Sequence, residues 1–211
     1  MNVQSIGILG AGKVGIVLAQ RALAAGYKVY LANSKAPESL KLTAHFLAPG
    51  AEVVSNIEAA QRADVVILAL PLGKFRTIPQ DALKGKIVID AMNYWWEVDG
   101  PREDIVPNDH SSSEAVQAWF TDARIVKAFS HMGYHDLHDF HRPADAPDRK
   151  AIAVAADSQE DAQTVATIID RFGYDPVIIG DLKSGQQLEP GNPAFGLTAS
   201  KEALQKLFNL S

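Results

Sequence analysis

Three glycines near the N-terminus have the spacing Gly-x-Gly-x-x-Gly. Gly10, Gly12 and Gly15 directly follow the apolar run 6–9 and open a helical pattern that ends at Gly26. A Gly-rich turn between a strand and a helix N-terminus lets backbone N–H groups approach a pyrophosphate. The glycines allow the tight turn, the close approach of the phosphates and the close packing of the helix. The sequence therefore predicts a dinucleotide site at this turn.

The residues after the next predicted strand indicate which dinucleotide binds. The ribose of NAD is normally bound by an acidic residue about 20 positions past the glycines. Here the strand at 28–32 runs into Asn33, Ser34 and Lys35, and no acidic residue occurs before Glu38. Asn33 and Ser34 can donate hydrogen bonds to a 2′-phosphate, and Lys35 adds a positive charge. We therefore expect NADP in preference to NAD; a polar loop that lacks an acid for other reasons is the alternative.

Apolar and aromatic residues follow three of the later predicted strands. Ligands of open α/β sheets bind beyond the carboxyl ends of the strands, and an apolar mouth suits a flat aromatic ligand beside a nicotinamide ring. Bordering the cofactor we expect Leu70, Pro71, Leu72, Ala91 and Asn93. Bordering the second substrate we expect Met92, Tyr94, Trp95, Trp96, Phe129, Ser130, Met132 and Gly133. One of the adjacent tryptophans is expected to be structural, because neighbours in an extended segment point opposite ways.

Four histidines follow the sixth predicted strand. On a helix, His131, His135 and His138 would share a face, and three imidazoles can bind zinc or iron; His141 lies just beyond. Gly133 and the polar, Pro-containing surroundings argue against a continuous helix, so we expect histidines of a loop surface or pocket and no metal. His131 is the candidate catalytic residue, placed to hydrogen-bond or protonate the second substrate, with a spectator role as the alternative.

Alternating strands and helices are needed to bring these segments to one edge of a sheet. Strands are predicted at 6–9, 28–32, 52–54, 64–70, 86–90, 124–129, 151–155 and 176–180. Helices are predicted from the Gly-rich turn to residue 26 and at 37–47, 57–62, 113–120, 157–172 and 198–208, with a polar connection at 131–149. This order predicts a Rossmann-type α/β fold, a doubly wound, mostly parallel sheet with a small C-terminal strand and helix extension. We expect a single domain over 1–211, in which 1–130 is the NADP-binding core and 131–211 completes the sheet and the second-substrate pocket.

Composition limits the classes of function. The chain has 211 residues, of which 47% are hydrophobic, a formal net charge of -5 and no cysteine. Nucleic acid and anionic membranes are disfavoured as partners, because binding phosphates needs a concentrated basic face. The lack of cysteine excludes disulfides, thiol catalysis and thiolate metal sites. No leader pattern is visible and the apolar runs are of strand length, so we expect a cytoplasmic protein that does not span a membrane.

Several of these segments together resemble the family of F420-dependent NADP reductases. They are the Gly-rich turn, Ala32-Asn33-Ser34-Lys35-Ala36-Pro37-Glu38-Ser39-Leu40, Ala69-Leu70-Pro71, Ile89-Asp90-Ala91-Met92-Asn93-Tyr94, Val126-Lys127-Ala128-Phe129 and Leu188-Glu189-Pro190-Gly191. The resemblance extends over essentially the whole chain. It implies a Rossmann-type domain with a small C-terminal extension, and hydride transfer between NADPH and the deazaflavin coenzyme F420. The domain also resembles the cytoplasmic part of ferric reductases that use NADPH and flavin.

The resemblance further implies roles for individual residues. It implies that Ala11, Lys13 and Val14 lie around the phosphates and that Asn33, Ser34 and Lys35 lie around the 2′-phosphate. It also implies that Pro71 and Leu72 lie beside the cofactor and that residues 128–132 lie near the second ring system. Three positions depart from the family pattern: Lys35 replaces an arginine, Met92 a smaller or polar residue, and Ser130 an asparagine. The last two concern the second-substrate pocket, so they leave the identity of the acceptor open.

Direct hydride transfer between the nicotinamide and a flavin-like ring is the reaction that we expect. In such chemistry the protein mainly sets distance and orientation, and the second substrate is a small redox molecule, F420 or a flavin. An NADPH-dependent reductase of a small carbonyl, an imine or ferric iron is the alternative. A carbonyl or imine would need a proton donor, for which the candidates are His131, Tyr94, Tyr134 and Lys127. A nucleotide-binding regulator without turnover is a third interpretation. We also expect a homodimer, because little of the chain is left to cover the cleft.

Overall fold

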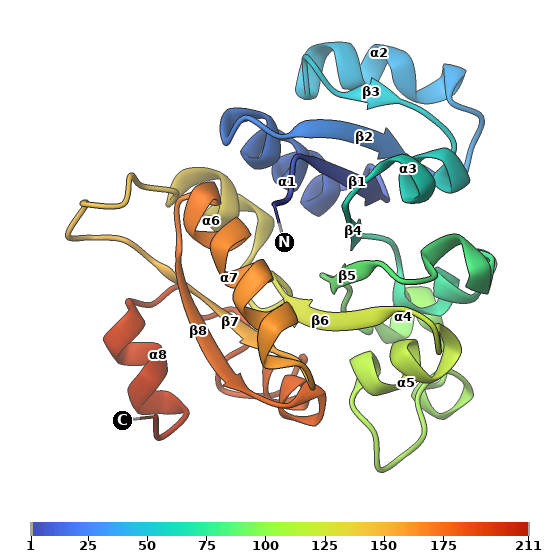
Figure 1. The fold of residues 1–211 in the computed structure, drawn as a ribbon. Helices are drawn as coiled ribbons and strands as arrows, with labels where there is room; N and C mark the ends of the chain where they lie inside the picture. The colour runs from blue at the N-terminus through green and yellow to red at the C-terminus, as the bar shows by residue number, and fades with distance from the viewer. Residues whose placement is uncertain (1, 211) are drawn as a thin grey trace.

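One eight-stranded sheet runs through the computed structural model, which describes residues 2–210 (Figure 1). Its strand order is β3-β2-β1-β4-β5-β6-β7-β8. The strands are β1 Ser5–Leu9, β2 Lys28–Ala32, β3 Glu52–Val53, β4 Val65–Leu68, β5 Ile87–Asp90, β6 Arg124–Ala128, β7 Ala151–Ala155 and β8 Asp175–Gly180. Strands β1 to β6 pair in parallel, and the order reverses between β1 and β4. The doubly wound α/β fold predicted from the sequence is confirmed, with its ligand crevice expected at this reversal.

Helices cover both faces of the sheet, which explains why its central strands are apolar throughout. Ile8 and Ile67, paired across β1 and β4, belong to one core cluster, whereas the next residues along, Leu9 and Leu68, belong to another. The first cluster is covered by α1 Lys13–Ala24, α2 Glu38–Leu47 and α7 Gln159–Phe172. The second is covered by α3 Asn56–Arg62 and α5 Ser112–Trp119.

The C-terminal third of the chain extends the same sheet. Strand β7 pairs antiparallel with β6, placing Ala155 opposite Lys127, and β8 pairs parallel with β7. Helix α8 Lys201–Leu207 packs Leu204 into a third cluster with Ala153 and Val177. The predicted strands at 151–155 and 176–180 are therefore confirmed as parts of the sheet.

Short helical turns occupy segments that the sequence left as connections. They are η1 Leu72–Thr77, η2 Gln80–Leu83, α4 Trp96–Asp99, η3 Arg102–Asp104, α6 Tyr134–Asp139 and η4 Leu182–Leu188. Pro71, Pro79 and Pro101 directly precede η1, η2 and η3, where the missing proline N–H leaves no helical hydrogen bond unmade. Helix α6 corrects the expectation of a connection throughout 131–149, because Gly133 precedes the helix and does not interrupt it. Within residues 2–210, no helix combines the length and apolar composition that crossing a bilayer requires.

Candidate functional site

The Gly-rich turn joins β1 to α1 at the carboxyl edge of the sheet. Gly10 has a φ of +117°, and a Cβ on this residue would collide with the carbonyl oxygen of Ala69. A Cβ on Gly15 would collide with the carbonyl oxygen of Gly10. A Cβ on Gly12, in contrast, would meet nothing within 4 Å. Two glycines therefore allow the turn to pack against its surroundings, and the third leaves open space beside the backbone.

The N-terminus of α1 lacks the side-chain caps that several other helices have. Ser55, Ser111, Ser158 and Ser200 each accept a hydrogen bond from a first-turn N–H of α3, α5, α7 and α8. In α1 the N-cap is Gly12, no side chain caps the helix, and the first turn contains no acidic residue. Its first N–H groups and the positive end of the helix dipole therefore remain available to an anion.

A cleft of about 800 Å³ connects this turn with the end of β2. Its lining comes from the ends of β1, β2 and β4, from the segments after them and from the start of α3: Leu9, Gly10, Ala11, Gly12, Asn33, Ser34, Asn56, Ala69, Leu70, Pro71, Lys74, Thr77 and Ile78. The Oδ1 atom of Asn56 is buried and accepts no hydrogen bond from residues 2–210. The open space at Gly12, the uncapped helix and this unpartnered acceptor fit a dinucleotide that runs from its pyrophosphate at the turn to its adenosine at β2.

The residues after β2 form a tight polar turn. Asn33 Oδ1 accepts a hydrogen bond of 2.9 Å from the Lys35 N–H, which orients the side chain, and the amide NH₂ of Asn33 can donate to a ligand. Ser34 and Lys35 are exposed. The structure therefore brings Asn33 and Ser34 into the same cleft as the Gly-rich turn and places Lys35 directly after them.

Four of the residues that line the cleft come from segments that the sequence did not assign to the site. Asn56 comes from α3, and Lys74, Thr77 and Ile78 come from η1 and its end. The signal that could have revealed Lys74 and Thr77 is their place just after Pro71, at the carboxyl end of a central strand. Their three-residue spacing puts them on one side of a 3₁₀ turn.

Several residues expected around the second substrate are buried in the core. Met92 is 2% exposed among Leu68 and Leu72, and Phe129 is 1% exposed and packs on Phe172 with ring centroids 5.6 Å apart. Ser130 and Met132 are buried as well. The side chains of Met92, Phe129 and Met132 belong to the two clusters on either side of the sheet, and Ser130 is a buried polar residue. This burial corrects the expectation that the four side chains line a pocket.

The exposed part of this edge is aromatic. Trp95 is 48% exposed and stands edge-on to Phe195, with ring centroids 5.7 Å apart, while Trp96 is 62% exposed. Tyr94 donates its hydroxyl hydrogen bond to the Gly100 carbonyl at 2.7 Å. Asn93 donates to the Ser130 carbonyl at 2.7 Å, joining the ends of β5 and β6. The loop after β5 therefore presents two indole rings while its polar side chains hold it in place.

His131, the expected catalytic residue, lies in the interior. Its side chain is 1% exposed, and its Nε2 accepts a hydrogen bond of 3.0 Å from the Ala153 N–H of β7. Burial lowers the pKa of His131 to about 4, although the backbone carbonyls of Leu197 and Ala194 act in the opposite direction. The ring is therefore neutral at pH 7 and holds the extension to the sheet, which does not suit a proton donor to a ligand.

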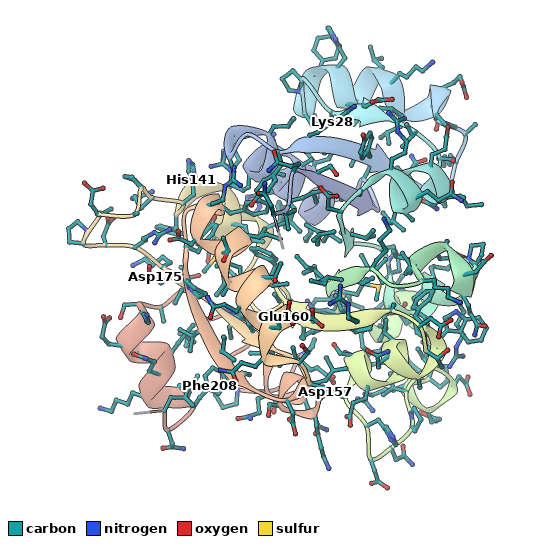
Figure 2. All side chains as sticks on the ribbon, in the orientation of Figure 1. Lys28, His141, Asp157, Glu160, Asp175 and Phe208 are labelled. Carbon is teal, nitrogen blue, oxygen red and sulfur yellow. The ribbon has the colours of Figure 1, made fainter. Side chains whose placement is uncertain are left out.

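The other histidines do not converge on one point. His135 and His138 are exposed on α6, and His138 Nδ1 pairs with Asp139 at 2.8 Å. His141 lies beyond the end of α6, at the edge of the molecule (Figure 2). No group of three or more histidine, aspartate or glutamate side chains within residues 2–210 has the arrangement of a metal site.

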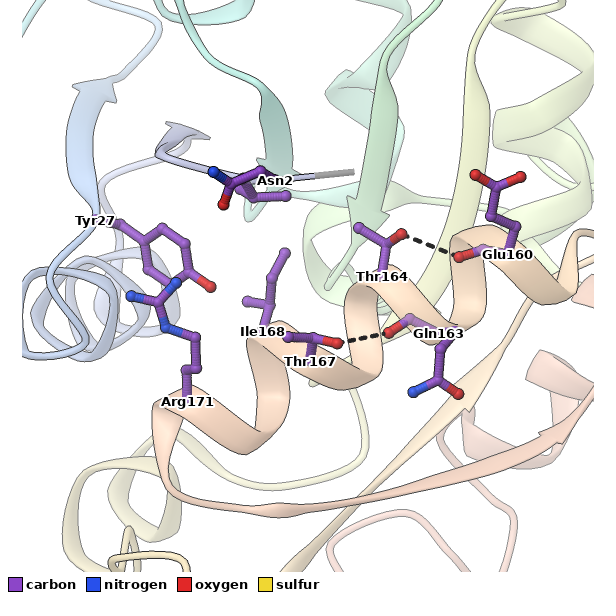
Figure 3. A pocket seen from close by; sticks show the side chains of 9 residues that line it. Asn2, Tyr27, Glu160, Gln163, Thr164, Thr167, Ile168 and Arg171 are labelled. Carbon is purple, nitrogen blue, oxygen red and sulfur yellow. Dashed lines mark hydrogen bonds between the residues drawn. The ribbon is translucent and has the colours of Figure 1, made fainter.

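A second cavity lies at the opposite, amino edge of the sheet. It measures about 280 Å³ and is bounded by Asn2 and Val3 just before β1, by Tyr27 and by one face of α7 (Figure 3). Arg171 lies over the Tyr27 ring, with its guanidinium carbon 4.1 Å from the ring centroid. Thr164 and Thr167 donate back to α7 carbonyls. This cavity is separate from the nucleotide cleft, which opens at the carboxyl ends of the strands.

An open sheet with a Gly-rich turn at its strand-order reversal defines the Rossmann class of dinucleotide-binding proteins. Residues 5–94 match the family described as "NADP oxidoreductase coenzyme F420-dependent". The F420-dependent NADP reductase of Methanocaldococcus jannaschii is 30% identical over 203 residues, which cover 87% of this chain and 86% of that protein. The chain belongs to this family and is an NADP-dependent oxidoreductase.

Two further relatives are similar over most of this chain. Metalloreductase STEAP3 of Rattus norvegicus is 26% identical over 187 residues, which cover 87% of this chain. The chain spans only 35% of the length of that metalloreductase. The crystal structure of a hypothetical protein from Sinorhizobium meliloti has 29% identity and a TM-score of 0.78, covering 94% of this chain and 96% of that one.

Proposed function

We propose that this protein transfers a hydride between NADP(H) and a flavin-like acceptor such as the deazaflavin coenzyme F420. The observation that carries the proposal is the cleft joining Gly12 to the acid-free turn Asn33-Ser34-Lys35. The acceptor is suggested by the F420-dependent reductase of Methanocaldococcus jannaschii, to which the chain is similar, and by the exposed indoles of Trp95 and Trp96 at the same edge. Flat aromatic surfaces suit a tricyclic ring.

Each wall of the cleft has a role in this proposal. The first N–H groups of α1 hold the pyrophosphate, and Ala11, Lys13 and Val14 surround it. Ser34, Lys35 and the amide of Asn33 hold the 2′-phosphate. Leu70 and Pro71 line the cleft and border the adenosine side. Leu72 is fully buried in the core, which corrects the expectation that it borders the cofactor. Ala91 and Asn93, which follow β5, border the nicotinamide. Bound NADPH supplies the hydride. The chain's residues set the distance between the nicotinamide and the acceptor ring and exclude water from their contact.

Three of the four side chains that could protonate a carbonyl or imine already have other partners. His131 is buried against β7, and Tyr94 donates to Gly100. Lys127 is buried with Asp90. Tyr134 accepts a hydrogen bond of 3.1 Å from Lys13 and keeps its own O–H to donate. The first three contacts favour an acceptor that takes a hydride from NADPH and a proton from solvent, and Tyr134 is the side chain that a carbonyl or imine reductase would need.

Anaerobic mixing tests the reaction. The purified protein, NADPH and one acceptor are combined, with F420, FMN, a small cyclic imine and no acceptor compared in parallel. We expect rapid loss of NADPH absorbance with a bleached deazaflavin or flavin band. Loss of NADPH with the imine alone would count against the proposal. So would a stable NADPH absorbance with every acceptor.

A homodimer and a cytoplasmic location remain predictions from the sequence. In the dimer a second subunit would cover exposed apolar surface, for which Trp95, Trp96 and Val98 are candidates. Sedimentation velocity at low protein concentration measures the assembly, and a fully active monomer would contradict the dimer.

A further inference from the structure

A buried lysine and a buried aspartate face each other below the carboxyl edge of the sheet. Lys127 on β6 and Asp90 at the end of β5 are both fully buried, and Lys127 Nζ lies 3.4 Å from Asp90 Oδ2. Removing two charges from water costs more free energy than most ion pairs return, unless further hydrogen bonds satisfy both groups. The other partners of the pair therefore indicate what it does.

Both polar backbone groups of one loop residue are held by this pair. Lys127 Nζ donates to the Met92 carbonyl at 2.6 Å, and the Met92 N–H donates to Asp90 Oδ1 at 2.9 Å. Ser113, in the first turn of α5, donates to Asp90 Oδ2 at 2.6 Å and orients that carboxylate. The lysine stem is packed in turn by Gly185 of η4, where a Cβ would lie 3.3 Å from Lys127. The pair thus fixes the peptide groups on both sides of Met92.

The loop that is fixed in this way is the one proposed to border the nicotinamide. Ala91 and Asn93 flank Met92, and Asn93 donates across to the Ser130 carbonyl at the end of β6. Asn93 Oδ1 is buried and has no hydrogen-bond donor within residues 2–210, so it can accept from an amide of a ligand. Trp95 follows at the end of this loop, and Trp96 opens α4. A shift of Met92 would therefore displace both proposed sides of the hydride contact.

We propose that Lys127 and Asp90 are positioning residues, which hold the loop after β5 in the position where it borders the nicotinamide and its hydride acceptor. The proposal rests on the function proposed above. NADPH affinity comes mainly from contacts at the pyrophosphate and the 2′-phosphate, at the other end of the cleft. Loss of the pair should therefore slow hydride transfer much more than it weakens NADPH binding.

The test uses the double variant Asp90→Asn/Lys127→Met. Neutralising both partners avoids an uncompensated buried charge. The asparagine at position 90 can still accept a hydrogen bond from the Met92 N–H, but the methionine at position 127 cannot donate one to the Met92 carbonyl. We expect an NADPH dissociation constant within about threefold of wild type and a single-turnover hydride-transfer rate at least about tenfold lower. The fluorescence anisotropy of bound NADPH should fall, because the nicotinamide becomes more mobile.

A matched control is Lys86→Met. Lys86 Nζ also donates to a backbone carbonyl, that of Ala63 at 2.6 Å, but it lies just before β5 at the amino edge of the sheet. Loss of this hydrogen bond should lower the free energy of unfolding without changing the hydride-transfer rate per folded molecule.

Ser113→Ala is a milder variant than the double substitution, since it removes only the hydroxyl that orients Asp90. We expect it to lower the same rate by about threefold.

The outcomes separate this inference from the proposed function. A rate per folded molecule in the double variant equal to that of wild type would overturn the positioning role. If the double variant does not fold, Ser113→Ala decides, and an unchanged rate overturns the role. If wild type reduces no acceptor, the proposed function fails, and the positioning role is then decided by the fluorescence anisotropy of bound NADPH alone. A lower anisotropy in the double variant than in wild type supports the role, and an equal anisotropy overturns it.

Discussion

Gly12 is the residue of the Gly-rich turn where a side chain would face open space. A Cβ there meets no atom within 4 Å, and its φ of -78° is accessible to any residue. Gly10 differs on both counts, with a φ of +117° and the Ala69 carbonyl directly beside it. At the scale of single residues, binding and folding therefore depend on different glycines of one motif.

Replacing Gly12 by valine should separate these two effects. We expect Gly12→Val to fold, with a melting temperature close to that of wild type, and to bind NADPH at least about tenfold more weakly, because the side chain occupies the space that the phosphates need. Thermal unfolding and NADPH titration measure the two quantities. Gly10→Ala is the control and should lose stability as well. Wild-type NADPH affinity in Gly12→Val would contradict the placement of the pyrophosphate.

Lys35 supplies the positive charge at the end of β2. Lys35→Glu places a carboxylate beside the proposed 2′-phosphate and should weaken NADPH binding by about 10- to 100-fold, while NADH binding changes by less than about threefold. Titration of the variant with both nucleotides is the measurement. Lys41→Glu, on the exposed face of α2, is a charge-matched control. Equal losses for the two nucleotides would argue against a 2′-phosphate at this turn.

At the scale of elements, sequence patterns predicted the strands better than what lies between them. The run 65–70 is apolar because both faces of β4 are covered, and this pattern is visible in a single sequence. The burial of His131 depends on Ala153, 22 residues later, which becomes its partner only when β7 pairs antiparallel with β6. The inward direction of Met92 and Phe129 likewise depends on how each chain segment leaves its strand. Phe129 has a φ of +63°, a conformation that its residue type does not indicate.

The N-terminus of α5 shows how the C-terminal segment supports the edge of the site. Glu189, which is buried, accepts a hydrogen bond of 2.6 Å from the Ser112 N–H and pairs with Arg102 at 3.1 Å. Ser113, next along α5, then contacts Asp90. The motif 188–191, noted in the sequence only as part of a resemblance, thus has a structural role in holding α5.

Glu189→Ala should destabilise the fold through this helix. We expect the free energy of unfolding to fall by about 2 kcal/mol, since a charge-assisted hydrogen bond to a buried N–H is lost and Arg102 loses its partner. Urea unfolding monitored by tryptophan fluorescence measures the change. Glu160→Ala, an exposed glutamate in the first turn of α7, is the control and should change stability by less than about 0.5 kcal/mol. Equal effects of the two substitutions would contradict the role of Glu189.

At the scale of the whole molecule, the buried imidazole of His131 links stability to pH. Its pKa is about 4 in the folded chain, against an ordinary value of 6.5. Below pH 6.5 the unfolded chain therefore takes up a proton that the folded chain does not bind. The contribution is complete above pH 6.5 and is lost as the pH falls toward 4, by up to about 3 kcal/mol.

Comparison with His131→Gln isolates this contribution. Between about pH 7.5 and about pH 5, wild type should lose about 2 kcal/mol more stability than the variant, as measured by urea unfolding at both values. The same loss in both proteins would show that other groups cause the pH dependence. Because the ring is buried, we also expect the hydride-transfer rate per folded molecule to be unchanged by the substitution.

The most direct test of the proposed reaction follows the hydride itself. NADPH carrying deuterium at nicotinamide C4, prepared as each of the two epimers, is mixed anaerobically with the protein and F420. The reduced deazaflavin is then analysed by mass spectrometry. A deazaflavin receives the hydride on carbon, so the label does not exchange with water as it would from a flavin nitrogen. We expect one epimer to deliver its deuterium to the deazaflavin and the other to retain it. Unlabelled reduced deazaflavin from both epimers, or no reduction of F420, would contradict direct transfer between the two rings.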